Sequence, residues 1–301
     1  MTQSNSDLPI INQVSQAHNF GALRSVKRFS DGVVNRVYLV SAKHGKFVAR
    51  LNEDCLVTFK KEAWAIERAS KFGVIAPKVF GVGEIGNTGY MVMEYVSGKN
   101  FSDVKRNRRK ALNDFGRQTK LINSIEVGGF GFFLDWGDEI TFKETWSETC
   151  EVQHKFIFGN SDLVQMGALT NEEQNRVIDF LAPMNDWKYP PMLCHGDVST
   201  GNVIVKPDGT VVVIDWTQVK GGVAPYYDLA GLSEKLTDAD FREFLQGYGM
   251  SPEEFAADRM NYRRIRLCDV ARGASWAHQV KHSNPDRFIE EVRQVYHSIF
   301  G

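Results

Sequence analysis

An aspartate, an asparagine and a second aspartate stand between residues 193 and 216 at a spacing that suits phosphoryl transfer. Asp197 follows His195 and Gly196, Asn202 comes five residues later, and Asp215 ends a predicted strand. The first carboxylate could accept the proton of an attacking hydroxyl, and the other two side chains offer hard oxygen ligands for Mg²⁺. The order His-x-Asp-x-x-x-x-Asn matches the spacing of kinase catalytic loops. We therefore predict Asp197 as catalytic base and Asn202 and Asp215 as metal ligands. The alternative is an ordinary hairpin with capping residues.

The same stretch predicts a β-hairpin that would expose these side chains. Strands are expected at 203–206 and 211–214, joined by Pro207-Asp208-Gly209. This is a turn sequence because proline sets the φ angle that the turn needs and glycine tolerates a positive φ.

Composition indicates a soluble globular protein and gives no support for nucleic-acid or membrane partners. The 301 residues are 43% hydrophobic and 24% charged, with a net charge of −1. Residues 1–96 carry 12 Lys and Arg against 8 Asp and Glu, whereas the remainder carries 24 against 29. The acidic excess of the second part, which holds Asp197, suits a cationic acceptor.

Cysteine usage and the N-terminal sequence point to a cytoplasmic protein. The four cysteines are far apart and form no Cys-x-x-Cys motif, so neither a zinc site nor a disulfide framework is expected. The polar N-terminus lacks a signal-peptide pattern. No apolar run approaches the roughly 20 residues of a membrane span.

The first 96 residues predict a small sheet with one long helix. Strands are expected at 25–30, 35–41, 45–51, 78–85 and 89–95, with a helix at 57–72. We place a domain boundary after Val96, which divides the chain into residues 1–96 and 97–301.

Several residues of this first part could bind a nucleotide. The turn that holds Ser30, Gly32 and Asn35 could fold backbone N–H groups over phosphates, although a plain hairpin turn is the alternative. Arg50 closes a strand where kinases carry a phosphate-binding lysine, and Glu62 on the following helix could pair with it. The alternative for Glu62 is a charge on a solvated helix face.

The second part is predicted to be mostly helical. A helix is expected at 102–124, capped by Ser102 or Asp103, and its basic run at 105–110 is interpreted as a solvated face. A loop rich in glycine and aromatic residues follows at 127–148. Helices continue to 187 and again from 237 to 300, and Asp228 could cap or anchor a helix.

These motifs together resemble the aminoglycoside phosphotransferase family, also called the phosphotransferase enzyme family, which is similar to choline and protein kinases. The resemblance runs from about residue 22 to 295 and rests on the set Ser30–Asn35, Arg50, Glu62, Glu94–Val96, His195–Asn202, Ile214-Asp215-Trp216 and Tyr227-Asp228-Leu229-Ala230.

The resemblance implies an α+β bilobal protein-kinase-like fold, with a small antiparallel sheet lobe plus one helix and a larger, mostly helical lobe. It implies ATP or GTP as phosphate donor and Mg²⁺ as cofactor. The backbone at Glu94 and Val96 would meet the base, and the 30–35 loop would cover the phosphates, with a single glycine to do so. The partner is expected to be a small-molecule hydroxyl acceptor, and the chain a monomer or homodimer.

The acceptor itself is left open by the sequence. Family members act on aminoglycosides, macrolides, choline-like amines, homoserine and sugars, so membership alone does not indicate antibiotic resistance. Side chains available for a polycationic sugar are Glu234, Asp238, Asp269, Trp276 and Tyr262. The alternatives are a kinase of a metabolic amino alcohol or sugar, a nucleotide-binding pseudokinase without turnover, and a protein kinase, for which the chain lacks Asp-Phe-Gly and Ala-Pro-Glu motifs.

Overall fold

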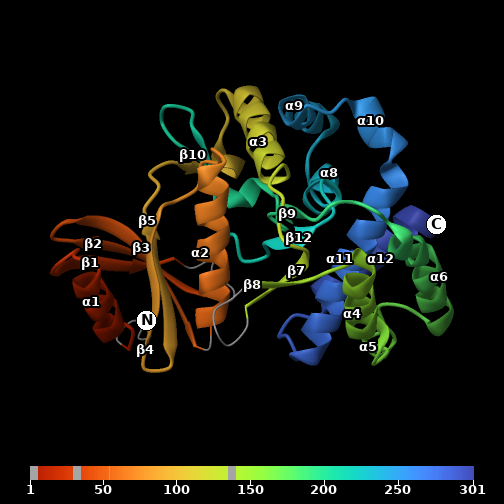
Figure 1. The fold of residues 1–301 in the computed structure, drawn as a ribbon, viewed down its shortest axis with the longest axis horizontal. Helices are drawn as coiled ribbons and strands as arrows, with labels where there is room; N and C mark the ends of the chain where they lie inside the picture. Colours follow the sequence, from red (N-terminus) through yellow and green to blue (C-terminus); the bar gives the residue numbers. More distant parts are fainter. Residues whose placement is uncertain (1–5, 30–34, 54, 135–139) are drawn as a thin grey trace.

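The computed structural model describes residues 6–29, 35–53, 55–134 and 140–301. A small lobe built on a sheet and a larger, mostly helical lobe lie side by side (Figure 1). Among the described residues, no helix has the length and apolar character needed to cross a membrane.

The small lobe is an antiparallel sheet in the order β1-β2-β3-β5-β4, which confirms the predicted five-stranded sheet. Its strands are β1 (Leu23–Arg28), β2 (Arg36–Ala42), β3 (Gly45–Glu53), β4 (Val79–Ile85) and β5 (Thr88–Glu94). Helix α1 (Leu8–Ala17) packs Ile11 and Val14 against Phe47, Ala49 and Leu51 of β3. Because side chains alternate along a strand, Arg50 faces the opposite side, where α2 (Leu56–Lys71) lies.

The connection between the lobes is attached to the predicted hairpin. Strand β6 (Lys99–Asn100) pairs with β10 (Val203–Val205), which pairs in turn with β11 (Val211–Val213). The Asn100 side chain also donates a hydrogen bond to the carbonyl oxygen of Gly201, at 2.7 Å. The segment that follows the small lobe therefore lies directly beside the loop that carries Asp197.

The loop predicted at 127–148 contains two strands, and that prediction was wrong. Strands β7 (Phe130–Leu134) and β8 (Ile140–Lys143) belong to a sheet in the order β8-β7-β12-β9, with β9 (Met192–Cys194) and β12 (Lys220–Gly222). Gly131 of β7 pairs with Gly221 of β12, some ninety residues away. Local sequence patterns do not report such a distant pairing, which is why this stretch resembled a loop.

The helix predicted from residue 102 begins later, as α3 (Arg108–Ile122). Asn100 accepts a hydrogen bond from the Ser102 backbone N–H and starts a short 3₁₀ turn, Phe101–Asp103, which ends at an extended Val104. Ser102 and Asp103 therefore do not cap α3. The basic run at its start is neutralised by ion pairs such as Arg108 to Asp240, at 2.7 Å, in agreement with a solvated face.

The remaining helices form the body of the large lobe (Figure 1). The long helix α11 (Arg259–Gln279) lies at its centre and packs Leu267 and Ala271 against Val292 of α12 (Asp286–Phe300). Around it lie α4 (Trp146–Phe158), α5 (Asp162–Gln165), α6 (Asn171–Leu181), α7 (Tyr226–Leu229), α8 (Leu232–Lys235), α9 (Asp238–Tyr248) and α10 (Pro252–Ala257).

Candidate active site

A buried histidine fixes the loop that carries Asp197. His195 is 0% exposed, and its Nε2 lies 3.1 Å from the carbonyl oxygen of Ile214 on the neighbouring hairpin. Its Nδ1 lies 3.4 Å from the Asp197 backbone N–H. Both contacts are satisfied by a neutral imidazole that donates from Nε2 and accepts at Nδ1. His195 therefore ties the start of the loop to the strand that leads to Asp215.

Asp228 anchors the same loop from the other side. Its carboxylate, 1% exposed, accepts hydrogen bonds from the backbone N–H groups of His195 and Gly196, at 3.0 and 2.7 Å. Asn123 donates a third bond at 2.6 Å and itself accepts from the Tyr248 hydroxyl at 3.0 Å. Asp228, which the sequence suggested as a helix cap or anchor, thus holds the Asp197 loop in place.

The glycine between His195 and Asp197 is required by the geometry of the loop. Gly196 has a φ of +79°, and a Cβ atom there would collide with the carbonyl oxygen of Gln218. Any other residue would carry both left-handed strain and this clash.

Asp197, Asn202 and Asp215 come together as predicted. The Asn202 side-chain N–H group donates to the Asp197 carboxylate at 2.8 Å and to the Asp197 carbonyl oxygen at 2.9 Å. The Ile214 N–H donates to the Asn202 carbonyl oxygen at 2.9 Å, so Asn202 lies next to the strand end that carries Asp215. Asp215 has a φ of +60°. Left-handed backbone in a non-glycine residue is often found at functional sites.

The donor set of Asn202 and Asp215 fits a Mg²⁺ ion. An amide oxygen and a half-exposed carboxylate are hard oxygen ligands, and Mg²⁺ keeps several waters, so two protein ligands suffice. Among the described residues, no three His, Cys, Asp or Glu side chains are grouped so that they could hold a metal ion.

The predicted pair between Arg50 and Glu62 is present. Arg50 Nη1 lies 2.5 Å from Glu62 Oε2, and the Glu62 side chain is fully buried. Burial raises the pKa of the Glu62 carboxyl, while the Arg50 guanidinium acts in the opposite direction. Arg50 Nη2 lies 3.8 Å from Asp215 Oδ1, so the pair reaches across to the large lobe.

Thr217 bridges this pair to Asp215, and the sequence reasoning missed it. Its hydroxyl accepts from Arg50 Nη2 at 3.0 Å and donates to Asp215 Oδ1 at 2.7 Å. The sequence could have indicated Thr217, because it stands only two residues after Asp215. Asn123 and Tyr248 were also missed, and they had no local signal because their partners are distant in the chain.

The other predicted nucleotide-binding residues that the structure describes lie beside or at the ends of small-lobe strands. The Asn35 side chain accepts from Asn52 at 3.1 Å. Glu94 ends β5, where its backbone N–H donates to the Lys78 carbonyl oxygen at 2.8 Å, and Val96 is buried just beyond it. Ser30 and Gly32 lie outside the described residues.

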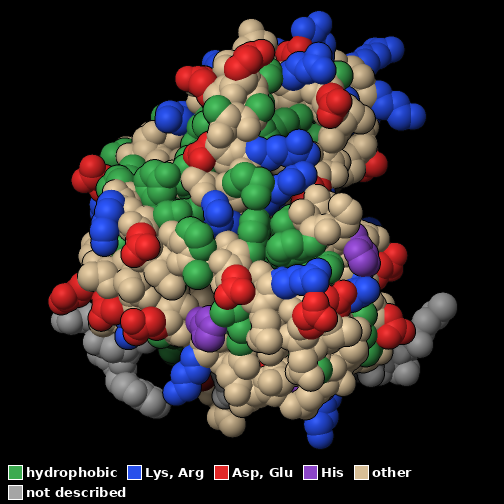
Figure 2. Space-filling view, turned by 90° about the vertical axis from the view of Figure 1, so that its right-hand side faces the viewer, with side chains coloured by type: hydrophobic (Ala, Val, Ile, Leu, Met, Phe, Trp, Pro, Cys, Tyr) green, Lys and Arg blue, Asp and Glu red, His purple; other side chains and the backbone are tan. Residues whose placement is uncertain are grey.

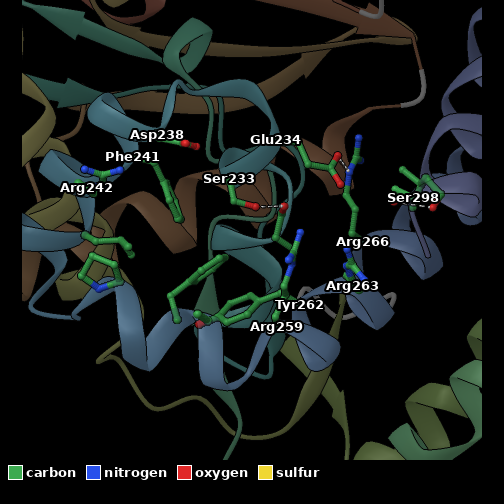
Figure 3. Close-up of a pocket in the computed structure, with 16 residues that line it drawn as sticks. Ser233, Glu234, Asp238, Phe241, Arg242, Arg259, Tyr262, Arg263, Arg266 and Ser298 are labelled. Carbon is green, nitrogen blue, oxygen red and sulfur yellow. Dashed lines mark hydrogen bonds and ion pairs between the residues drawn. The ribbon is translucent and has the colours of Figure 1, made fainter.

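The predicted acceptor residues are divided between two cavities. Asp269 lines a cavity of about 40 Å³ together with Asp197. Glu234, Asp238 and Tyr262 line a separate cavity of about 420 Å³ (Figure 3), which does not include Asp197. Trp276 lines neither and contacts the rings of His282 and Phe288.

The larger cavity is bordered by more cations than carboxylates. In Figure 3, Glu234 is paired with Arg266, at 2.6 Å. The face of the large lobe in Figure 2 likewise shows Lys and Arg side chains around a patch of hydrophobic side chains. The remaining basic residues that line this cavity are Arg242, Arg259 and Arg263.

A match to a known protein family shows which family this chain belongs to. A model of the Phosphotransferase enzyme family matches residues 25–267. The chain belongs to this family. The motif-based resemblance and the bilobal kinase-like fold are thereby confirmed, and the protein is a small-molecule kinase of this phosphotransferase family.

Similar proteins span nearly the whole chain. A Staphylococcus aureus protein named probable ketoamine kinase is 25% identical over 289 residues, which are 90% of this chain and 95% of the relative. A thermostable variant of aminoglycoside phosphotransferase APH(4)-Ia, solved as a ternary complex with ADP and hygromycin B, has a TM-score of 0.74 at 17% identity, covering 97% of this chain and 99% of that one. Choline kinase LicA from Streptococcus pneumoniae has a TM-score of 0.68 at 16% identity, with coverage of 96% and 98%. At these identities, the two structures show a shared fold.

Proposed function

We propose that this kinase transfers the γ-phosphate of ATP, or of GTP, to a hydroxyl of a small acceptor, with Asp197 as catalytic base. The observation that carries the proposal is the 2.8 Å contact between Asn202 and the Asp197 carboxylate, in a loop held by His195 and Asp228. This contact keeps one carboxylate fixed at the edge of the cavity of about 40 Å³.

In the proposed reaction, the acceptor hydroxyl gives its proton to an Asp197 carboxylate oxygen. The acceptor oxygen forms a bond to the γ-phosphorus, the bond between that phosphorus and the bridging β,γ-oxygen breaks, and ADP leaves. Phosphoryl transfer needs little covalent chemistry from the protein, so the fixed position of Asp197 supplies rate mainly by orienting the acceptor.

We infer that the nucleotide lies between the lobes, with a boundary after Val96 that separates residues 1–96 from 97–301. Arg50, held by Glu62, would contact the phosphates, and Asn35 belongs to the loop that would cover them with Ser30 and Gly32. The backbone at Glu94 and Val96 would bind the base. Asn202 and Asp215 would hold Mg²⁺, which neutralises charge on the phosphates when bound.

Ketoamines are the acceptor class to test first, because a relative that matches this chain over 95% of the relative's own length is named a probable ketoamine kinase. Aminoglycosides and choline-like amines come next, because proteins of the same fold bind or phosphorylate them. The second candidate function is a nucleotide-binding module without turnover. Two contacts argue against this second candidate. Asn202 donates a hydrogen bond to the Asp197 carboxylate, and its carbonyl oxygen accepts from the N–H of Ile214, the residue before Asp215.

The test is acceptor-dependent release of ADP or GDP, measured with Mg²⁺ and a panel of ketoamines, aminoglycosides and amino alcohols. Asp197→Asn should lower kcat by about a hundredfold or more, as expected on removal of a general base. Because Asp197 is not assigned to the nucleotide, thermal stabilisation by Mg-ADP should persist in this variant. Asp215→Asn should instead weaken that stabilisation.

Asp208→Asn is the matched control. Asp208 lies on the tip of the same hairpin, where it accepts from the Thr210 backbone N–H, at 2.9 Å. This variant should behave like the wild type. Near wild-type turnover in Asp197→Asn would exclude the assigned base, and nucleotide stabilisation without turnover on any acceptor would favour the non-catalytic module.

A further inference from the structure

One lysine beside the Asp197 loop has no charged partner. Lys220 is the first residue of β12 and pairs with Cys194 of β9, directly before His195. A Cβ atom on Gly196 would lie 3.0 Å from the Lys220 Cε atom, so the lysine side chain runs along the Asp197 loop. Its ammonium lies 4.6 Å from the centre of the Tyr227 ring, a residue that lines the same cavity as Asp197.

The ammonium of Lys220 makes no hydrogen bond or ion pair with any residue in the described part of the chain. Burial lowers its pKa to about 8, and the charge of Arg272 acts in the same direction. A partly desolvated cation without a partner is costly to keep in a fold. Such a group favours an anionic ligand that restores the missing interactions.

The carboxylates around the Asp197 cavity already have partners. Asp269 pairs with Arg272 at 2.8 Å, and Asp228 accepts three hydrogen bonds from the loop and Asn123. Asp197 forms no ion pair within the described residues, and its carboxylate accepts from the neutral Asn202 side chain at Oδ2, which leaves Oδ1 open to an acceptor. A polycationic acceptor would need several unpaired carboxylates at this place.

Two lysines near the cavity form no ion pair within the described residues. Lys235 lines the cavity, and Lys220 lies beside it against the Tyr227 ring. Arg266 also lines the cavity but is paired with Glu234 and Glu291, which leaves Lys220 and Lys235 as the cations without an ion pair among these described residues. This balance suits an acceptor with one negative charge, because a second negative charge would be repelled by Asp197 and by the nucleotide phosphates.

We propose that the acceptor carries a carboxylate in addition to its reacting hydroxyl, and that Lys220 binds that carboxylate. The proposal rests on the proposed function and goes beyond it by naming the charge of the acceptor. It makes Lys220 a specificity-determining residue, and it accounts for a lysine that would otherwise only pack on Tyr227.

Three open-chain six-carbon polyols of matched size provide the test: gluconate with a negative charge, sorbitol without charge, and N-methylglucamine with a positive charge. Their affinities for the full chain saturated with Mg-ADP are measured by calorimetric titration. Wild type should bind gluconate at least about tenfold more tightly than sorbitol, the scale of one hydrogen bond to a charged group. N-methylglucamine should bind most weakly.

Lys220→Met should bring the ratio of gluconate to sorbitol affinity close to one, and Lys220→Arg should restore a ratio above one. Lys71→Met is the matched control, because Lys71 is an exposed lysine on α2 paired with Glu67, and it should keep the wild-type ratio. Stabilisation by Mg-ADP shows that each variant is folded. The proposal is overturned if none of the polyols binds, if N-methylglucamine binds as tightly as gluconate, or if the preference survives in Lys220→Met.

ADP release with the same polyols separates this proposal from the assignment of the base. Gluconate binding that depends on Lys220, without Asp197-dependent turnover on any acceptor, would support the charge preference and reject the kinase mechanism. Asp197-dependent turnover that is fastest with N-methylglucamine would support Asp197 as the catalytic base and reject the preference for a negatively charged acceptor.

Discussion

At the scale of single residues, the surroundings of Lys220 bring the titration of its ammonium close to neutral pH. Burial and Arg272 lower its pKa to about 8, and the carboxylates of Asp269 and Asp228 and the Cys194 thiol act in the opposite direction. The Tyr227 ring covers the ammonium from α7, and burial raises the pKa of its hydroxyl further above the ordinary value. The Lys220 ammonium therefore loses its proton at lower pH than the Tyr227 hydroxyl, the Cys194 thiol and the Arg272 guanidinium do.

This titration predicts a pH-dependent acceptor preference. The ratio of kcat/KM for gluconate to that for sorbitol should be highest below about pH 8 and should fall as the pH rises through that value. Groups that act in the phosphoryl-transfer step itself affect the rates with both acceptors equally, so the ratio isolates Lys220. Initial rates across this pH range, with Lys220→Arg as control, provide the measurement. A ratio that stays constant through pH 8 would contradict the prediction.

The site residues that the sequence predicted are those that belong to short local motifs. Asp197, Asn202 and Asp215 lie in a loop and hairpin of some twenty residues, where spacing alone determines which side chains meet. Asn123 and Lys220 reach the same loop from other parts of the chain. Their contributions depend on how β9, β12 and α3 pack, which spacing does not report.

At the scale of elements, two glycines let α3 and α9 approach closely. A Cβ atom on Gly116 of α3 would collide with the Phe244 carbonyl oxygen, and one on Gly247 of α9 would collide with that of Asn113. The two helices therefore touch backbone to backbone. Through Asn123 at the end of α3 and Tyr248 at the end of α9, this contact positions Asp228.

Gly116→Ala should lower the free energy of unfolding by about 1–3 kcal/mol, the usual cost of overpacking, because the obstacle is backbone that cannot rotate away. Gly273→Ala is the matched control in a helix interior. Its Cβ would meet only the Phe288 ring, at 3.8 Å, so the variant should gain up to about 1 kcal/mol from helix propensity. Urea denaturation of both variants measures the difference. Equal stability of the two would show that α3 and α9 can separate without cost.

The elements that the sequence failed to predict share one physical cause. The start of α3 and the strands β7 and β8 depend on contacts outside their own segments, such as the pairing of Gly131 with Gly221. The small-lobe strands were predicted well because alternation of buried and exposed residues is a local pattern. The side of the sheet that faces α2 could likewise be assigned from that alternation.

At the scale of the whole molecule, two of the contacts between the lobes bear on the proposed nucleotide site. One is the chain connection through β6, which pairs with the β10 strand of the large lobe. The other is a set of side-chain contacts in which Arg50 and Glu62 of the small lobe meet Thr217 and Asp215 of the large lobe. The proposed nucleotide site lies between these two places, so a change in the side-chain contacts should alter nucleotide binding more than folding.

Thr217→Val tests this link, because it removes the hydroxyl and keeps the shape of the side chain. Arg50 Nη2 would lose its acceptor at 3.0 Å and Asp215 its donor at 2.7 Å, while the pair between Arg50 and Glu62 would remain. A lost hydrogen bond to a charged group is worth about 1.5–3 kcal/mol, so the affinity for Mg-ADP should fall by roughly tenfold or more. Thr217→Ser keeps the hydroxyl and should bind Mg-ADP like the wild type. Calorimetric titration measures both variants, and unchanged affinity in Thr217→Val would mean that the Thr217 bridge does not contribute to nucleotide binding.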